Sequence, residues 1–171
     1  MFINTLFFLN FILALFISNS SYASMLDIKP TDQPFPYQFS IPDNTYHKYC
    51  KNINSQGGED GILEQLVKEL EIEGGSFCEF GAANGIHLSN TYNLMQNYNF
   101  SGIAIELDKA RYQECVNNYK SFPNVQVFHG AVLYDDTDND LNAWLKKSNT
   151  PSDFDVLSID IDCDDYYVWK K

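Results

Sequence analysis

Four short apolar runs, separated by segments with helical spacing, restrict the fold of this chain more than any other feature. The apolar runs cover residues 76–80, 102–107, 125–128 and 154–161. The helical patterns cover residues 59–72, 88–98 and 108–119, the last capped by Asp108, and a shorter one contains Leu141, Trp144 and Leu145. Strands that alternate with helices of about 10 to 15 residues imply right-handed crossovers between parallel strands. The sequence therefore predicts an α/β fold with a doubly wound parallel sheet of about four strands.

The fourth apolar run is almost uninterrupted, which is typical of a strand that is covered on both faces of a sheet. Its outer edge is expected to be exposed, because no further strand pattern follows it before Lys171. An exposed apolar edge without charges pairs readily with another chain. We therefore expect self-association through this strand.

The charge of the chain excludes one class of partner. Eleven Lys and Arg stand against 23 Asp and Glu, so the formal net charge is −12 and the pI is about 4.4. Such a surface repels a phosphate backbone over most of its area. Binding to nucleic acid through a basic groove is therefore not expected, and a small molecule is the expected partner.

Residues 1–23 have the pattern of a secretory signal. They contain no charged residue, and the apolar stretch 6–17 is interrupted only by Asn10. This stretch is shorter than the roughly 20 helical residues that span a bilayer, and small residues precede a cleavage position after Ala23. The sequence predicts export to the periplasm or the medium. An uncleaved membrane anchor, which would make the membrane a partner, and a buried helix are the alternatives.

The rest of the chain divides into an arm and a domain. Residues 24–54 hold four of the six prolines and show no sustained period, so they are predicted to form an extended arm, and the domain covers residues 55–171. An exported chain with an even number of cysteines permits two disulfides, among Cys50, Cys78, Cys115 and Cys163. Free thiols, of which Cys78 and Cys115 are buried, are the favoured interpretation, and the disulfides stay open.

An acidic residue and two glycines follow the first predicted strand, in the sequence Glu79-Phe80-Gly81-Ala82-Ala83-Asn84-Gly85. Gly81 permits a tight turn, and Gly85 lets the backbone approach a ligand closely. The second strand ends in Glu106, 21 residues after Gly85, where a carboxylate can accept hydrogen bonds from both ribose hydroxyls. Ala83 stands in place of the middle glycine of the dinucleotide fingerprint. The pattern therefore favours an adenosine ligand without a pyrophosphate.

Four segments, taken in order, resemble one protein family: residues 55–61, 79–85, 105–108 and 157–162. They resemble the class I S-adenosylmethionine-dependent methyltransferases and, within these, the FkbM-like group. The resemblance implies a Rossmann-like sheet, S-adenosylmethionine as cofactor, and transfer of its methyl group to a hydroxyl oxygen of a sugar or small metabolite. Members of the family have further strands after the fourth, so the resemblance implies a methyltransferase domain that is truncated at its C-terminus.

The resemblance also assigns residues to the cofactor. Glu79, Gly81 and Gly85 would line the methionine end of S-adenosylmethionine, and Glu106 would hold its ribose. Gly130-Ala131, after the third strand, would flank the adenine.

Three carboxylates alternate at the end of the fourth strand, Asp160, Asp162 and Asp164, so their side chains can share one face. By the resemblance, Asp160 would face the transferred methyl group. Mutual repulsion can raise the pKa of one such carboxyl, and Asp160 and Asp162 are therefore the candidate catalytic bases for the acceptor hydroxyl. Binding of Mg²⁺ or Ca²⁺ and simple capping of the next turn are the alternatives, and no metal ligands are assigned.

Two other functions stay open. Asp160-Ile161-Asp162 after an apolar strand also resembles the metal-binding D-x-D of nucleotide-sugar glycosyltransferases, although residues 79–85 do not fit that class. A catalytically inactive remnant that binds a nucleoside is the second. Residues 136–140 begin like a calcium loop but lack its glycine and its final glutamate, so they are predicted to form a turn that caps the next helix.

Overall fold

In a computed structural model of the chain, the structure describes residues 3–9, 11–17, 46–135, 138–150, 152–161 and 164–170. The strands are β1 (Ile3–Leu9), β2 (Phe11–Ile17), β3 (Ser76–Phe80), β4 (Ser101–Glu106), β5 (Val125–His129) and β6 (Val156–Ile159). The α-helices are α1 (Glu59–Glu69), α2 (Tyr92–Tyr98), α3 (Lys109–Asn118), α4 (Leu141–Ser148) and α5 (Asp165–Lys170). Two short 3-10 helices are η1 (His47–Tyr49) and η2 (Tyr119–Ser121).

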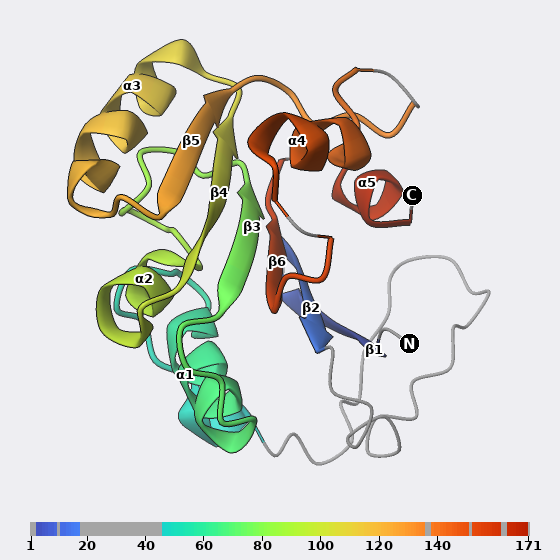
Figure 1. The fold of residues 1–171 in the computed structure, drawn as a ribbon. Coiled ribbons are helices and arrows are strands. Elements are labelled where there is room, and N and C mark those ends of the chain that lie inside the picture. The colour runs from blue at the N-terminus through green and yellow to red at the C-terminus, as the bar shows by residue number, and fades with distance from the viewer. Residues whose placement is uncertain are drawn as a thin grey trace.

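The strands form one sheet in the order β1-β2-β6-β3-β4-β5 (Figure 1). From β6 to β5 all neighbouring strands are parallel. The parallel part begins in the middle at β3, continues outward to β4 and β5, and returns to place β6 on the other side of β3. The predicted α/β fold with four parallel strands is therefore confirmed, and the direction of strand order reverses between β3 and β6.

Helices cover both faces of the parallel strands (Figure 1). Helices α1, α2 and α3 pack with β3 on one face, and α4 and α5 pack on the other. Consecutive residues of β3 belong to opposite cores: Phe77 lies in the first and Cys78 in the second, and both are fully buried. Because β3, β4 and β6 contribute side chains to two apolar layers, most of their residues are buried on both faces.

The predicted start of α3 is confirmed, whereas the predicted start of α2 is wrong. Asp108 caps α3 as predicted, because its Oδ1 accepts the N–H groups of Ala110 and Arg111 at 3.0 and 2.9 Å. Helix α2 begins at Tyr92 rather than at residue 88. Leu88 has a left-handed backbone with φ of +64°, which ends any continuous helix at that position.

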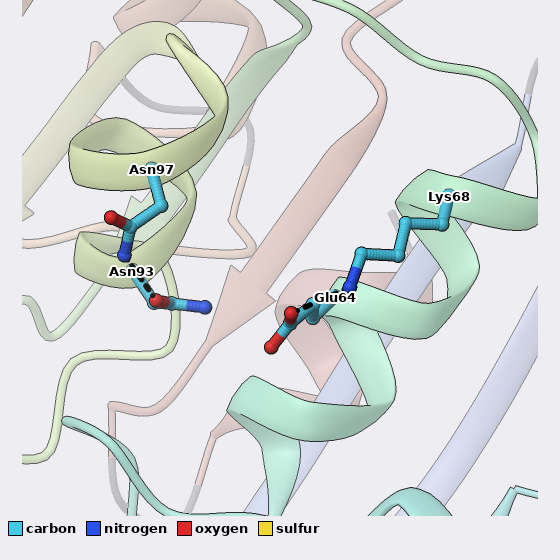
Figure 2. A network of polar contacts seen from close by, with 4 residues as sticks. All are labelled: Glu64, Lys68, Asn93 and Asn97. Carbon is cyan, nitrogen blue, oxygen red and sulfur yellow. Dashed lines mark hydrogen bonds and ion pairs between the residues drawn. The ribbon is translucent and has the colours of Figure 1, made fainter.

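Helices α1 and α2 each contain a polar pair four residues apart (Figure 2). In α1, Lys68 Nζ lies 2.7 Å from Glu64 Oε1. In α2, Asn97 Nδ2 donates to Asn93 Oδ1 at 2.8 Å. Such pairs stabilise a helix by only about 0.2–0.5 kcal/mol each, so burial of the apolar faces of these helices decides their position.

The outer edge of β6 is covered in the full chain. β2 pairs with β6 in antiparallel orientation, with Leu13 opposite Ser158 and Ala14 opposite Leu157. Self-association through this edge therefore stays a prediction for a chain without its first 23 residues. The predicted cleavage position after Ala23 and the arm up to residue 45 lie outside the described residues. Among the described residues no helix is long and apolar enough to span a membrane.

The cysteines that the structure describes are free thiols. Cys78 and Cys115 are buried and Cys50 is half-buried. This agrees with the favoured interpretation for these three residues, whereas Cys163 lies outside the described part of the chain.

Candidate functional site

The turn after β3 is constrained by its neighbours on both sides. Gly81 has a φ of +73°, and its N–H donates to the carbonyl of Ile105 at 2.9 Å. A Cβ atom at this position would overlap the carbonyl oxygen of Asp160, which follows β6. The turn therefore requires glycine for its backbone conformation and for the close approach of the β6 end. This contact lies at the point where strand order reverses, which is where open α/β sheets bind their ligands.

Glu106 joins this turn to the end of β4. Its side chain is only 6% exposed. One carboxylate oxygen accepts the N–H of Ala83 at 2.7 Å, and the other accepts the N–H of Asp108 at 2.7 Å. The predicted meeting of the glycine turn with a carboxylate from the neighbouring strand is therefore present. The carboxylate is held in place by backbone groups, and each oxygen has acceptor capacity left for a ligand.

A cavity of about 510 Å³ lies beside Glu106, Gly81 and Asp160. Its lining comes from the segments that follow the carboxyl ends of β3, β4, β5 and β6. Of the residues that the sequence singles out for the site, those that line it are Gly81, Glu106, Gly130, Ala131 and Asp160. The volume lies within the range of about 300–1,000 Å³ that is usual for small-molecule sites.

The wall formed after β5 is positioned by the indole of Trp144. The Trp144 Nε1–H donates to the carbonyl of Ala131 at 2.8 Å. The N–H of Gly130 donates to the carbonyl of Glu106 at 3.0 Å. A Cβ atom on Gly130 would lie 2.5 Å from the indole ring, so glycine lets α4 approach this wall. The segment at 130–131 is therefore fixed to β4 on one side and to α4 on the other.

Gly85 does not line the cavity. A Cβ atom there would lie 2.6 Å from the Tyr119 ring and 2.8 Å from Cys115 Sγ. The Tyr119 hydroxyl donates to the carbonyl of Gly85, and Asn118 Nδ2 donates to the carbonyl of Asn84, both at 2.8 Å. In this structure Gly85 therefore lets the end of α3 pack against the turn.

Glu79 is also absent from the cavity lining, because its carboxylate points into the protein. It is 3% exposed and accepts hydrogen bonds from three consecutive residues, Ser89, Asn90 and Thr91. Burial, and to a lesser degree the negative charge of Asp160, raises the pKa of Glu79 to about 7, although these hydrogen bonds act in the opposite direction.

Only one of the two candidate catalytic carboxylates belongs to the described residues. Asp160 lines the cavity, whereas Asp162 lies outside the described residues. Asp164 also lines the cavity and is exposed. Within the described part of the chain, no group of three or more His, Cys, Asp or Glu side chains is arranged to hold a metal ion.

Sequence reasoning missed several residues that line the cavity. Leu107 follows Glu106 and is 66% exposed, although it is a large apolar residue. Lys109 and Arg111 lie in the first turn of α3, where the helix dipole favours acids rather than bases. Two features of the sequence could have indicated these residues as site residues: an apolar residue just after a strand, and basic residues at the start of a helix. Val132 and Leu133 line the wall after β5, where the sequence shows no such signal.

Comparison with known proteins gives structural likenesses of limited extent. No family model matches the chain, and no curated protein matches it. A Methanococcus maripaludis protein, described as an S-adenosyl-L-methionine-dependent methyltransferase, matches with a TM-score of 0.34 and 19% identity over 41% of this chain and 32% of its own. A Galdieria sulphuraria protein, described as a sarcosine dimethylglycine methyltransferase, matches with a TM-score of 0.34 and 16% identity over 48% of this chain and 34% of its own.

A third solved structure is coclaurine N-methyltransferase bound to N-methylheliamine and SAH. It matches with a TM-score of 0.35 and 19% identity over 48% of this chain and 25% of its own. The chain thus spans between a quarter and about a third of the length of these structures.

Proposed function

We propose that this domain binds S-adenosylmethionine in the cavity at the carboxyl ends of β3 to β6, and that it is an FkbM-like methyltransferase acting on a hydroxyl of a small metabolite or sugar. The observation that carries the proposal is the Glu106 carboxylate. Backbone donors on both sides hold it at a cavity that is also lined by the glycine turn and the β6 end. This arrangement supports a nucleoside ligand, because a fixed carboxylate accepts hydrogen bonds from the two hydroxyls of a ribose.

The base of the nucleoside has an apolar surface beside Glu106. Leu107 exposes most of its side chain, and Val132 and Leu133 line the cavity after β5. An exposed leucine at a cavity wall gains free energy when a flat ring covers it, at about 25 cal/mol for each Å² of apolar surface removed from water. We assign these three residues to the adenine.

The reacting end of the ligand lies, in this proposal, at the contact between Gly81 and Asp160. When bound, S-adenosylmethionine supplies a methyl group on a positively charged sulfur. Gly81 lets the backbone of the β6 end lie against the turn, and Asp160, at that end, provides a carboxylate near the acceptor hydroxyl. Alignment of the acceptor oxygen contributes most of the rate in such a transfer, and Asp160 would accept the proton that the hydroxyl loses.

Three exposed tyrosines next to the cavity support a ring-shaped acceptor. Tyr134 follows the cavity residue Leu133, and Tyr166 and Tyr167 lie on α5. Their exposed fractions are 44%, 45% and 53%. The ring centroids of Tyr134 and Tyr167 are 5.3 Å apart, and those of Tyr166 and Tyr167 are 5.6 Å apart. Together they present an apolar surface with hydroxyl groups, on which an acceptor ring with its own hydroxyls can lie.

Titration calorimetry with S-adenosylmethionine tests the proposal. The wild-type protein should bind, and Glu106→Gln should weaken binding about 10- to 100-fold, because a hydrogen bond to a charged group contributes about 1.5–3 kcal/mol. Leu107→Ser should also weaken binding while leaving the fold intact, since this side chain is exposed. Glu114→Gln, an exposed acid on α3, is the control that should bind like the wild type.

Two outcomes contradict the proposal. One is a folded wild-type protein that binds no S-adenosylmethionine. The other is equal affinity of wild type, Glu106→Gln and Leu107→Ser. A protein that binds the ligand but transfers no labelled methyl group to any hydroxyl acceptor would support the non-catalytic nucleoside-binding alternative instead.

A further inference from the structure

A buried carboxylate lies two residues before the glycine turn that lines the candidate cavity. Glu79 lies at the end of β3, two residues before Gly81, and accepts the N–H of Asn90 at 2.9 Å. It also accepts the hydroxyl of Ser89 at 3.1 Å and the hydroxyl of Thr91 at 2.7 Å. The carboxylate therefore holds the segment that connects the glycine turn to α2.

The same network extends to both sides of the point where strand order reverses. Ser89 Oγ accepts the N–H groups of Thr91 and Tyr92 at 3.2 and 3.1 Å, at the start of α2. Asn90 Nδ2 donates to the hydroxyl of Ser158 in β6 at 3.0 Å. Glu79 thus connects β3, the start of α2 and β6, and the end of β6 carries Asp160 into the cavity.

The ionised form of Glu79 fits this network better than the protonated form. The N–H of Asn90 can only donate, and the hydroxyls of Ser89 and Thr91 both donate to the carboxylate. A protonated carboxyl has one acceptor site fewer and one O–H group that needs an acceptor of its own. Protonation therefore requires at least one hydroxyl to reorient, and this loosens the segment between the glycine turn and α2.

No cation compensates the charge of Glu79 in the described residues. The titratable groups that face it are Asp160 at the β6 end, Cys78 on β3, Cys115 on α3 and Tyr119 at the end of α3. In their usual states at neutral pH one of these is negative and three are neutral. Burial and the charge of Asp160 raise the pKa of Glu79 to about 7, so both forms are present near neutral pH.

We propose that Glu79 is a positioning residue whose ionisation is coupled to binding of a positively charged ligand in the candidate cavity. The choice of S-adenosylmethionine as that ligand rests on the function proposed above. A ligand cation near Asp160 and the glycine turn attracts the ionised Glu79 carboxylate, and so favours the ionised form and the ordered turn. By reciprocity, ionised Glu79 favours binding of the cation, and binding releases a proton when Glu79 was protonated before.

The direction and size of the pH dependence of binding follow from this linkage. Affinity for the cation rises with pH and levels off once Glu79 is fully ionised. With a pKa of about 7, the ionised fraction of Glu79 is about tenfold greater at pH 8 than at pH 6. S-adenosylmethionine should therefore bind up to about tenfold more tightly at pH 8 than at pH 6. Methylthioadenosine, which has the same nucleoside with a neutral sulfur and no amino acid part, should bind equally at both pH values.

The experiment is calorimetry with both ligands at pH 6, 7 and 8, on wild type, Glu79→Gln and Glu73→Gln. Glu79→Gln keeps the shape of the side chain but removes the charge. The affinity of this variant for S-adenosylmethionine should therefore not change with pH. Glu73→Gln, an exposed acid in the loop before β3, should keep the wild-type profile. Repetition in buffers of different ionisation enthalpy measures the released proton, and circular dichroism checks that each variant is folded at each pH.

The outcomes separate this inference from the proposed function. If wild type binds S-adenosylmethionine equally at pH 6 and pH 8, or if Glu79→Gln keeps the wild-type pH profile, the coupling is wrong and the proposed function stands. If methylthioadenosine binds but S-adenosylmethionine does not, the coupling is wrong and the cavity is a nucleoside site only. If neither ligand binds, both proposals fail.

Discussion

The contact between the glycine turn and the β6 end leads to a stability test that needs no ligand. Gly81→Ala combines two unfavourable changes: a side chain on a backbone with φ of +73°, and overlap of the new Cβ with the carbonyl oxygen of Asp160. Two other glycines separate these effects. Gly74 has a φ of +64°, but its Cβ would meet only Asn99, at 3.6 Å. Gly102, in β4, would bring its Cβ into overlap with the Phe77 carbonyl oxygen without a left-handed backbone.

The expected losses in free energy of unfolding follow from these contacts. A left-handed conformation costs a residue with a Cβ about 1–2 kcal/mol, and alanine recovers about 0.4–1 kcal/mol by restricting the unfolded chain. Gly74→Ala should therefore cost about 1 kcal/mol. In Gly81→Ala the Asp160 carbonyl must also move away to at least 3.0 Å from the new Cβ, which disrupts the 3.1 Å hydrogen bond from Asp160 N–H to Phe80.

Loss of that buried hydrogen bond adds about 1–3 kcal/mol, so Gly81→Ala should cost about 3 kcal/mol in total. Gly102→Ala should lower the free energy of unfolding by about 2 kcal/mol, because the overlap alone forces the backbone to shift. Urea unfolding followed by circular dichroism measures all three variants, with m-values compared to confirm that the denatured states are similar. If Gly81→Ala is no less stable than Gly74→Ala, the close approach of the β6 end does not constrain the turn, and the description of the cavity wall is wrong.

Two further results are expected. Because burial raises the pKa of Glu79 from 4.5 to about 7, the folded state holds this proton more tightly than the unfolded state; the resulting stabilisation is present below pH 4.5 and is lost as the pH rises through 7. Relative to Glu79→Gln, wild type should therefore lose about 3 kcal/mol between pH 4 and pH 8 in urea unfolding, and parallel pH profiles would contradict the buried carboxylate. A chain that begins at residue 24 lacks β2 and leaves the β6 edge open, so it should elute from a sizing column at a larger apparent mass than the full chain; a smaller one would show that the edge does not self-associate.

The local pattern of the sequence was sufficient for the parallel sheet. Each of β3, β4, β5 and β6 coincides with a predicted apolar run to within a few residues, because burial on two faces leaves a signal in the strand itself. The cap at Asp108 could be predicted for the same reason, since its partners lie within three residues. The position of Glu106 beside the turn also followed from the sequence, because parallel strands place their carboxyl ends at one edge.

The roles of individual residues in the motif could not be read in this way. Gly85 and Glu79 occupy positions that suggest a ligand, yet Gly85 packs against Tyr119 and Glu79 holds the residues before α2. Both contacts join residues ten or more positions apart, and the sequence contains no local record of which side of the turn faces the cavity. The start of α2 was misplaced because the apolar period continues through Leu88, although its backbone is left-handed.

The sequence by itself determined the order along the chain of β3 to β6 and of the helices between them, the acidic surface, and the glycine turn with a carboxylate near it. These follow from periodicity, composition and spacing, which act over a few residues. Only the tertiary structure decided that β2 covers the β6 edge, that Leu107, Lys109 and Arg111 line the cavity, and that the Glu79 carboxylate is buried. Those features depend on which distant segments come together, and the direction of a side chain, not its position in the motif, decides whether a carboxylate lines the cavity or holds other segments of the protein.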